Sequence, residues 1–239
     1  MSKGLRHERE VAQRALCSGA LLRRWQWEYA AHWVNETTLA AHQCDHQALV
    51  HWLQIEGLGE ALSYDERNLL RAPLGSWSLN DLARVLDSAE RLAVLLWALS
   101  HLETLPPYDT PSNLSLLLMP LEILTPSIDF VWCARLRPQA ELEALREEAT
   151  LWQWRAQAED LERMGLRTAE GQPMRAVIRQ ALAHAQAQGR LQRLYEGDVT
   201  AFGRPYARLS APQHALARAI STQRAHAVAW VCDAEASWG

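Results

Sequence analysis

Lysine is almost absent from this chain of 239 residues. Of its 24 basic residues only Lys3 is lysine, and all the others are arginine. Arginine suits bidentate contacts with carboxylates or phosphates. Here, however, the bias runs through the whole chain together with abundant alanine and leucine, which indicates a GC-rich bacterial genome more than a dedicated anion site.

An excess of positive charge is also missing. The formal net charge is −4, and the isoelectric point is near 6.1. Proteins that bind the phosphate backbone of nucleic acids usually carry a basic surplus, because that surplus displaces counterions from the phosphates. We therefore expect no nucleic acid partner.

Cysteine is scarce and scattered. The four cysteines contain no Cys-x-x-Cys pair, so they predict neither a zinc knuckle nor a disulfide framework. Reduced thiols in a cytosolic protein are the simple interpretation. The charged N-terminus leads into no apolar run that resembles a signal peptide. The predicted compartment is the bacterial cytoplasm.

The apolar run Leu92–Leu99 is too short to cross a membrane. It has eight residues, whereas a spanning helix needs about 18 or more. Charged residues such as Glu90 and Arg91 flank it. Leucines at helical spacing line one face, and alanine, valine and tryptophan fill most of the rest. The pattern predicts a buried central helix over 89–104 and no membrane partner.

Helical periodicity dominates the chain, and alternation of apolar and polar residues is lacking. With 49% hydrophobic residues, the chain can bury a full core. We predict an all-α protein with a single compact domain over 1–239. The alternative is two lobes, 1–125 and 137–239, joined by a proline-rich segment.

Helix boundaries are predicted from capping boxes, glycines and prolines. Capping patterns begin at Ser63 and Ser210, and a further start signal lies at Ser78. A break is expected near Ser18-Gly19, because glycine inside a helix costs about 1 kcal/mol relative to alanine. The longer helices are expected over 5–33, 39–56, 89–104, 138–164, 173–189 and 210–232. Short helices or turns are expected in 105–138, and mixed helix and loop in 190–208.

No motif of a familiar catalytic class is present. A nucleophile elbow, a phosphate-binding loop and a dinucleotide fingerprint are all missing from the sequence. His42 and His46 would share a helix face, as paired zinc ligands do, but a third ligand is lacking and Cys44 would point away. We expect no metal and no cofactor, and we favour a non-enzymatic protein.

The long helix after Pro138 carries candidate binding residues. Trp152 and Trp154 would project roughly 200° apart, so at most one can face the core. Trp154 with Arg155 would then lie in a groove or an interface, where tryptophan and arginine often anchor binding. The alternative is that this helix is sandwiched and both indoles are buried.

Two further candidates, Arg224 and His226, lie on the last predicted helix. Arg224 could pair with Glu90 and so tie the last helix to the central one. Alternatively, Arg224 and His226 could line a polar pocket. Buried charges are retained for either reason, so the sequence leaves both open.

Several landmarks in order resemble a bacterial family known as domain of unknown function 4272. Two positions depart from the family pattern: Gln223 replaces an acidic residue before Arg224, and the chain stops at Trp238-Gly239, where relatives continue with an acidic tail. The resemblance implies a helical domain and brings no activity, cofactor or partner. The landmarks are Leu49–Leu53, Leu62–Glu66, Leu95–Leu99 with Leu105-Pro106, Ala134–Arg137, Leu151–Arg155 and Gln223–Trp230.

These observations favour a cytoplasmic, non-enzymatic helical protein that binds another protein, as an accessory or immunity-type factor. The alternative is an uncharacterised enzyme or small-ligand binder. That version would use a pocket between the central and last helices, with Arg155, Arg224 and His226. A weaker idea is self-association through an exposed apolar strip.

Overall fold

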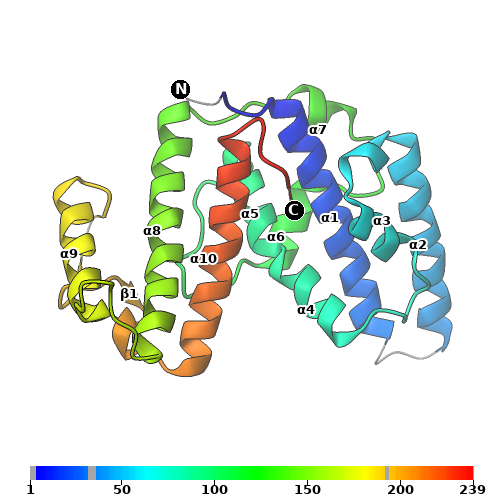
Figure 1. Ribbon diagram of the computed structural model, residues 1–239. Helices are drawn as coiled ribbons and strands as arrows, with labels where there is room; N and C mark the ends of the chain where they lie inside the picture. Colours follow the sequence, from blue (N-terminus) through cyan, green and yellow to red (C-terminus); the bar gives the residue numbers. More distant parts are fainter. Residues whose placement is uncertain (1–3, 32–35, 192–193, 239) are drawn as a thin grey trace.

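The computed structural model describes residues 4–31, 36–191 and 194–238. Helices supply nearly all of its regular structure, so the all-α prediction is confirmed (Figure 1). The α-helices are α1 Glu8–Ala31, α2 Glu36–Ile55, α3 Tyr64–Arg71, α4 Leu79–Asp87, α5 Ala89–Ala98, α6 Leu114–Leu118, α7 Ile128–Trp132, α8 Gln139–Arg163, α9 Met174–Ala187 and α10 Ala211–Val231. Short 3₁₀ helices are η1 Leu58–Ala61, η2 Met119–Leu121 and η3 Tyr206–Arg208.

Local capping signals predicted the helix starts correctly. Ser63, Ser78 and Ser210 each accept the backbone N–H of the third helical residue, whose side chain accepts the N–H of the cap in return. These reciprocal bonds satisfy N–H groups that a helix start leaves unpaired. Just after the C-terminal end of α8, Gly165 adopts a φ of 70°, the left-handed conformation expected of a glycine that ends a helix.

The central helix α5 is shorter than predicted. It ends at Ala98 and does not continue to residue 104. Ser100 adopts a φ of 64°, its N–H donates to Trp97 O at 3.0 Å, and the N–H of His101 donates to Leu96 O at 2.8 Å. This pair of bonds is a left-handed helix cap that usually has glycine where Ser100 stands. The sequence therefore lacked the usual end signal.

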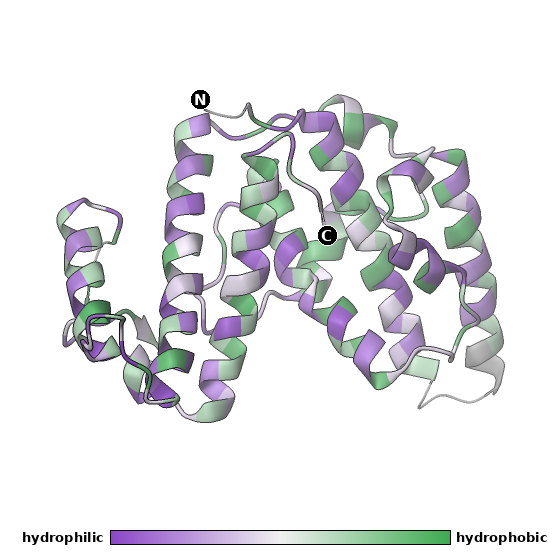
Figure 2. Cartoon of the chain, in the orientation of Figure 1, coloured by the Kyte–Doolittle hydropathy of each residue, from purple (hydrophilic) through white to green (hydrophobic). Residues whose placement is uncertain are grey.

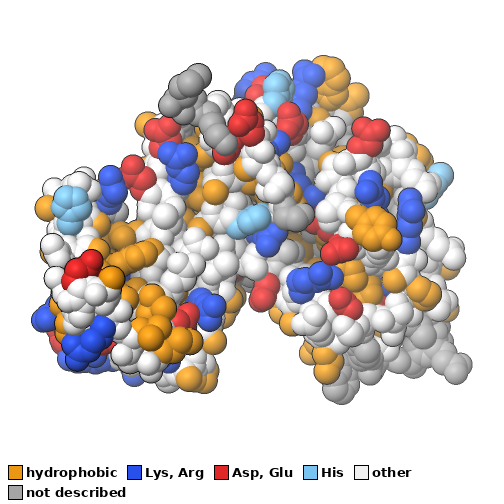
Figure 3. Space-filling view, in the orientation of Figure 1, with side chains coloured by type: hydrophobic (Ala, Val, Ile, Leu, Met, Phe, Trp, Pro, Cys, Tyr) orange, Lys and Arg blue, Asp and Glu red, His pale blue; other side chains and the backbone are white. Residues whose placement is uncertain are grey.

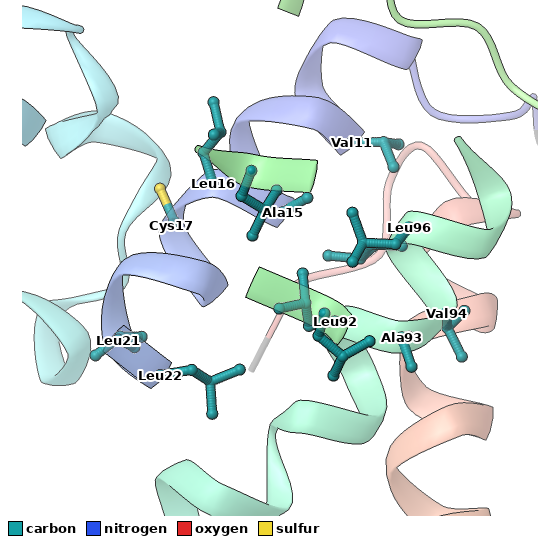
Figure 4. Packing of buried hydrophobic residues seen from close by; sticks show 14 of the residues in the cluster. Val11, Ala15, Leu16, Cys17, Leu21, Leu22, Leu92, Ala93, Val94 and Leu96 are labelled. Carbon is teal, nitrogen blue, oxygen red and sulfur yellow. The ribbon is translucent and has the colours of Figure 1, made fainter. Parts of the chain in front are cut away.

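The burial predicted for the central helix is confirmed. All five residues from Leu92 to Leu96 are fully buried. α5 contacts α1, α4, α6 and α10, and Figure 4 shows Leu92 and Leu96 on its side toward α1 and Val94 on the other side. Among the described helices, none combines the length and the apolar character needed to span a membrane.

Helix α1 is continuous through Gly19, so the predicted break is wrong. A Cβ atom at Gly19 would overlap Leu121 Cδ1, which belongs to η2. The glycine therefore allows the 119–121 turn to approach the helix closely. This turn and α6 confirm that the proline-rich segment is packed on the core.

The segment predicted as mixed helix and loop contains a small hairpin. Strand β1, Thr200–Ala201, pairs antiparallel with β2, Arg204–Pro205. Two residues per strand are too few to produce a recognisable alternation in the sequence. The hairpin is therefore a correction to the sequence-based expectation, although it leaves the fold class unchanged.

Two clusters of buried residues form the core. The larger surrounds α1 and α5, and the smaller includes Trp152, Ile178 and Tyr206. Helices α8 and α10 lie side by side and contribute to both clusters, with α9 on the outer side of α8 (Figure 1). Figure 2 shows α5 as largely hydrophobic, whereas α8 mixes both residue types. The division into one or two lobes stays a prediction.

Candidate functional site

A cavity of about 1140 Å³ extends along one face of α8. Its walls come from three parts of the chain: the loop 103–108 after α5, the α8 face from Glu141 to Trp152, and residues within 188–191 and 195–203 after α9. Trp97 of α5 and Arg224 of α10 also line it. We call this cavity the α8 groove. It joins residues that lie up to 127 positions apart, from Trp97 to Arg224 (224 − 97 = 127).

Arg224 and Glu90 form a buried ion pair beside the α8 groove. Arg224 Nε donates to Glu90 Oε2 at 2.8 Å, and Arg224 Nη2 lies 2.7 Å from the same oxygen. Arg224 Nη1 donates to the carbonyl of Pro106 at 2.5 Å. Glu90 also accepts from the backbone N–H of Ser112 at 2.6 Å. The predicted pairing is present, and it ties α10 to α5 and to the following loop.

Aromatic rings continue from this ion pair into the α8 groove. Arg224 Cζ lies 5.0 Å from the centre of the Tyr108 ring, and Tyr108 stacks on Trp152 with centroids 4.6 Å apart. Tyr108 is only 6% exposed, and its hydroxyl has no hydrogen-bond partner among the described residues. Burial raises the pKa of Tyr108 above its ordinary value, so the phenol stays neutral.

Acidic side chains line the α8 groove, and two of them have no ion pair within the described ranges. Glu147 pairs with Arg190 at 3.2 Å, whereas no such partner is found for Glu103 or Glu148. Burial raises the pKa of Glu148, and Arg224 opposes that shift. Water still reaches the Glu148 side chain, which is exposed although protein atoms surround it in the concave wall. Solvent therefore moderates the shift.

Arg155 does not reach the surface of α8. Its side chain is fully buried and makes two parallel hydrogen bonds with Asp198, both 2.8 Å long. Its Nη1 also donates to Glu159 at 3.1 Å. Burial by itself lowers the pKa of Arg155, but Asp198 and Glu159 raise it by more. Arg155 is therefore a member of the polar core and not an exposed anchor.

Trp154 lies on the opposite side of α8 from Trp152. Trp152 is buried in the smaller core cluster, whereas Trp154 is partly buried against it and lines a second cavity of about 440 Å³ with Leu151 and His184. Helix α8 lies between α9 and α10, so both indoles meet a neighbouring helix. The prediction that both indoles are buried in a sandwiched helix is therefore correct for Trp152, whereas Trp154 is only partly buried.

His226 contacts Trp238 near the C-terminal end of the chain. Its Nε2 lies 2.5 Å from the backbone oxygen of Trp238, and the two rings meet edge to face at 5.7 Å. Burial and then the positive charge of Arg91 lower the pKa of His226 below its ordinary value. Arg155, Arg224 and His226 are therefore not brought together, and only Arg224 lines the α8 groove.

Sequence reasoning missed a polar network at the far end of α8. His214 Nε2 lies 2.8 Å from Asp160 Oδ1, and its Nδ1 lies 3.1 Å from the Tyr206 hydroxyl. This order of acid, imidazole and hydroxyl has the components of a proton relay. Tyr206, however, is fully buried, so the network stabilises the junction between α8, η3 and α10. Its residues are scattered over 55 positions from Asp160 to His214.

The histidines considered for metal binding have other contacts. His46 Nε2 lies 2.6 Å from the carbonyl oxygen of Leu70, and His42 stacks with Trp27 at a centroid distance of 6.4 Å. Burial lowers the pKa of His46. Across the part of the chain that the structure describes, no three metal-binding side chains gather at one point.

Other features of the surface are mixed in charge. On the face shown in Figure 3, acidic and basic side chains are interspersed, with scattered hydrophobic residues between them.

Comparisons of the sequence and of the structure with family models, curated proteins and solved structures gave no match. The resemblance to domain of unknown function 4272 therefore stays a prediction.

Proposed function

We propose that this chain binds another protein, and that the α8 groove receives a segment of that partner. The observation that carries the proposal is the size and lining of the groove. Its volume of about 1140 Å³ exceeds the roughly 300–1,000 Å³ usual for small-molecule pockets. Its walls include Trp97, Tyr108 and Tyr195, and such aromatic residues are enriched where proteins meet.

The same role was favoured from the sequence, but different residues now support it. Arg155 is enclosed by Asp198 and Glu159, so it is not available as a surface anchor. Glu148 and Tyr195 have exposed side chains in the α8 groove and are available for contact. The proposal also includes an accessory or immunity-type role for the protein and a location in the bacterial cytoplasm. It further includes membership in the family domain of unknown function 4272.

A site-specific photo-crosslinking experiment tests the proposal. A photoreactive amino acid replaces Thr104, an exposed residue of the groove wall, and the protein is expressed in the source cells. The matched control replaces Gln157, an exposed α8 residue that lines none of the cavities described above. We expect a crosslinked partner protein from position 104 and none from position 157.

A groove-filling variant completes the test. Ala144→Trp places a large side chain at an exposed helical position inside the α8 groove. It should abolish the crosslink from position 104, whereas Gln157→Trp should leave the crosslink unchanged. A crosslink that survives Ala144→Trp, or no crosslink from position 104, would refute partner binding in this groove. A small molecule found in native mass spectra of the wild-type protein would favour the ligand-binding alternative.

A further inference from the structure

The charges that face the α8 groove leave a negative surplus. Arg224 is compensated by Glu90, and Arg190 is compensated by Glu147. Glu141 pairs at the edge of the groove with Arg137, at 3.0 Å. Two carboxylates, those of Glu103 and Glu148, have no paired cation among the described residues. The groove is therefore suited to a positively charged group.

A second observation concerns a hydrogen-bonding group of a residue that lines the same groove. The Tyr108 hydroxyl is buried and has no hydrogen-bond partner within the described ranges, which is costly unless a bound group supplies one. After burial, the charges of Glu148 and Arg224 have the largest effects on the pKa of this hydroxyl, and both residues line the α8 groove. Tyr108 and Glu148 both line the α8 groove, so the hydroxyl is a candidate partner for a group bound beside Glu148.

The shape and chemistry of the α8 groove favour one class of cation. A guanidinium group is flat, carries five N–H donors and stacks on aromatic faces, whereas an ammonium is a compact and strongly hydrated charge. The groove offers the Glu148 carboxylate and the Tyr108 hydroxyl as acceptors, with the exposed ring of Tyr195 on its wall. An anion is disfavoured, because the donors of Arg224 are directed at Glu90 and Pro106.

We infer that the α8 groove recognises an arginine side chain of the partner protein, held between the Glu148 carboxylate and the Tyr108 hydroxyl. The inference rests on the proposed function, since it names the residue that the bound segment must carry. The net charge of −4 adds a weak general attraction for a basic partner.

Isothermal titration with short peptides tests this inference on the full chain. The probes are the blocked tripeptides alanine-arginine-alanine, alanine-lysine-alanine and alanine-citrulline-alanine, together with free arginine amide. Citrulline keeps the shape of arginine and removes its charge. We expect the arginine peptide to bind at least about tenfold more tightly than the citrulline peptide, with the lysine peptide in between.

Two substitutions identify the residues responsible. Glu148→Gln should weaken binding of the arginine peptide about tenfold, because it removes the negative charge of the carboxylate. Tyr108→Phe should weaken binding several-fold, because it removes the hydroxyl acceptor. The matched control is Glu143→Gln, on the same helix but outside the α8 groove, and it should leave binding unchanged. Thermal melting of each variant shows that a weakened affinity does not reflect unfolding.

The possible outcomes separate this inference from the proposed function. Equal affinities for the arginine and citrulline peptides, or an unchanged affinity after Glu148→Gln, would overturn the inference. If the crosslink from position 104 persists in that case, only the identity of the bound residue is wrong. Arginine amide binding as tightly as the peptide would support the guanidinium site but assign it to a free small molecule, which counts against the protein partner.

Discussion

Arg224 Nε lies 2.8 Å from Glu90 Oε2 in the interior of the protein, where it joins the last helix α10 to the central helix α5. The Arg224 and Glu90 side chains are 1% and 7% exposed. Glu90 also holds the loop after α5 through Ser112, and Arg224 holds it through Pro106. One ion pair thus connects α10 and α5 to the loop that carries Tyr108, a residue of the α8 groove.

Glu90→Gln should destabilise the protein strongly. The substitution leaves the buried charge of Arg224 without a counter-ion, a loss that typically costs about 3–5 kcal/mol. Urea denaturation followed by tryptophan fluorescence gives the free energy of unfolding. Glu143→Gln, a control on α8 that removes a carboxylate without an ion pair among those described, should change it by less than about 0.5 kcal/mol. A loss below about 1 kcal/mol for Glu90→Gln would show that the pair is not a structural tie.

Glu148→Gln should have the opposite effect on stability. Burial raises the pKa of Glu148 in the folded protein, so ionisation is less favourable in the folded state than in the unfolded chain. The stability contributed by protonation is fully present below the unfolded pKa of about 4.3 and is lost as the pH rises through the folded pKa. Glutamine cannot ionise, so the variant should be more stable at pH 7, by at most about 1 kcal/mol because solvent reaches this side chain.

The pH dependence provides the check on Glu148. Free energies of unfolding for wild type and Glu148→Gln should differ at pH 7 and converge near pH 4, where the wild-type carboxyl is increasingly protonated. Glu143→Gln should show no such convergence. A variant that is less stable than wild type at pH 7 would mean that ionised Glu148 has a stabilising partner in the folded protein.

Gly19→Ala should destabilise the protein although alanine is the better helix former. The added Cβ would overlap Leu121 Cδ1, so the 119–121 turn must move away from α1. Overpacking of this kind typically costs about 1–3 kcal/mol. Gly59→Ala is a suitable control, because no atom lies within 4 Å of the Cβ position there and φ is not positive. A gain in melting temperature for Gly19→Ala would contradict the steric argument.

Ser100→Gly should stabilise the end of the central helix. Ser100 adopts a φ of 64°, which costs a residue with a Cβ roughly 1–2 kcal/mol relative to glycine. Glycine also loses more backbone entropy on folding, so we expect a net gain of about 0.5 kcal/mol. Ser100→Ala keeps the Cβ and should be nearly neutral. Equal stabilities of the glycine and alanine variants would show that backbone strain does not matter at this position.

Local signals explain why much of the fold was predictable. The capping boxes at Ser63, Ser78 and Ser210 act within four residues, so the sequence contains both partners of each interaction. The end of α5 was not predictable in the same way, because its left-handed residue is Ser100 and not glycine. The break expected at Gly19 failed because the relevant contact, Leu121, is 102 positions away (121 − 19 = 102).

The candidate site was predictable only in its charged pair. A buried charge requires an opposite charge, so a pair between Glu90 and Arg224 was one of the two roles that the sequence left open, and the structure contains it. Tyr108 and Glu148 gave no comparable signal: Tyr108 follows two prolines in a loop, and Glu148 is one of several acidic residues on α8. That both residues line one groove depends on how α5, α8 and α10 pack.

The sequence by itself determined the helical class, most helix boundaries and the burial of Leu92–Leu96, because periodicity and capping act over a few residues. Only the tertiary structure decided that Arg155 is enclosed by Asp198, and that three distant segments form the α8 groove. The physical reason is that such sites consist of contacts between residues far apart in the chain. These contacts are fixed by side-chain packing across helices, which no local pattern encodes.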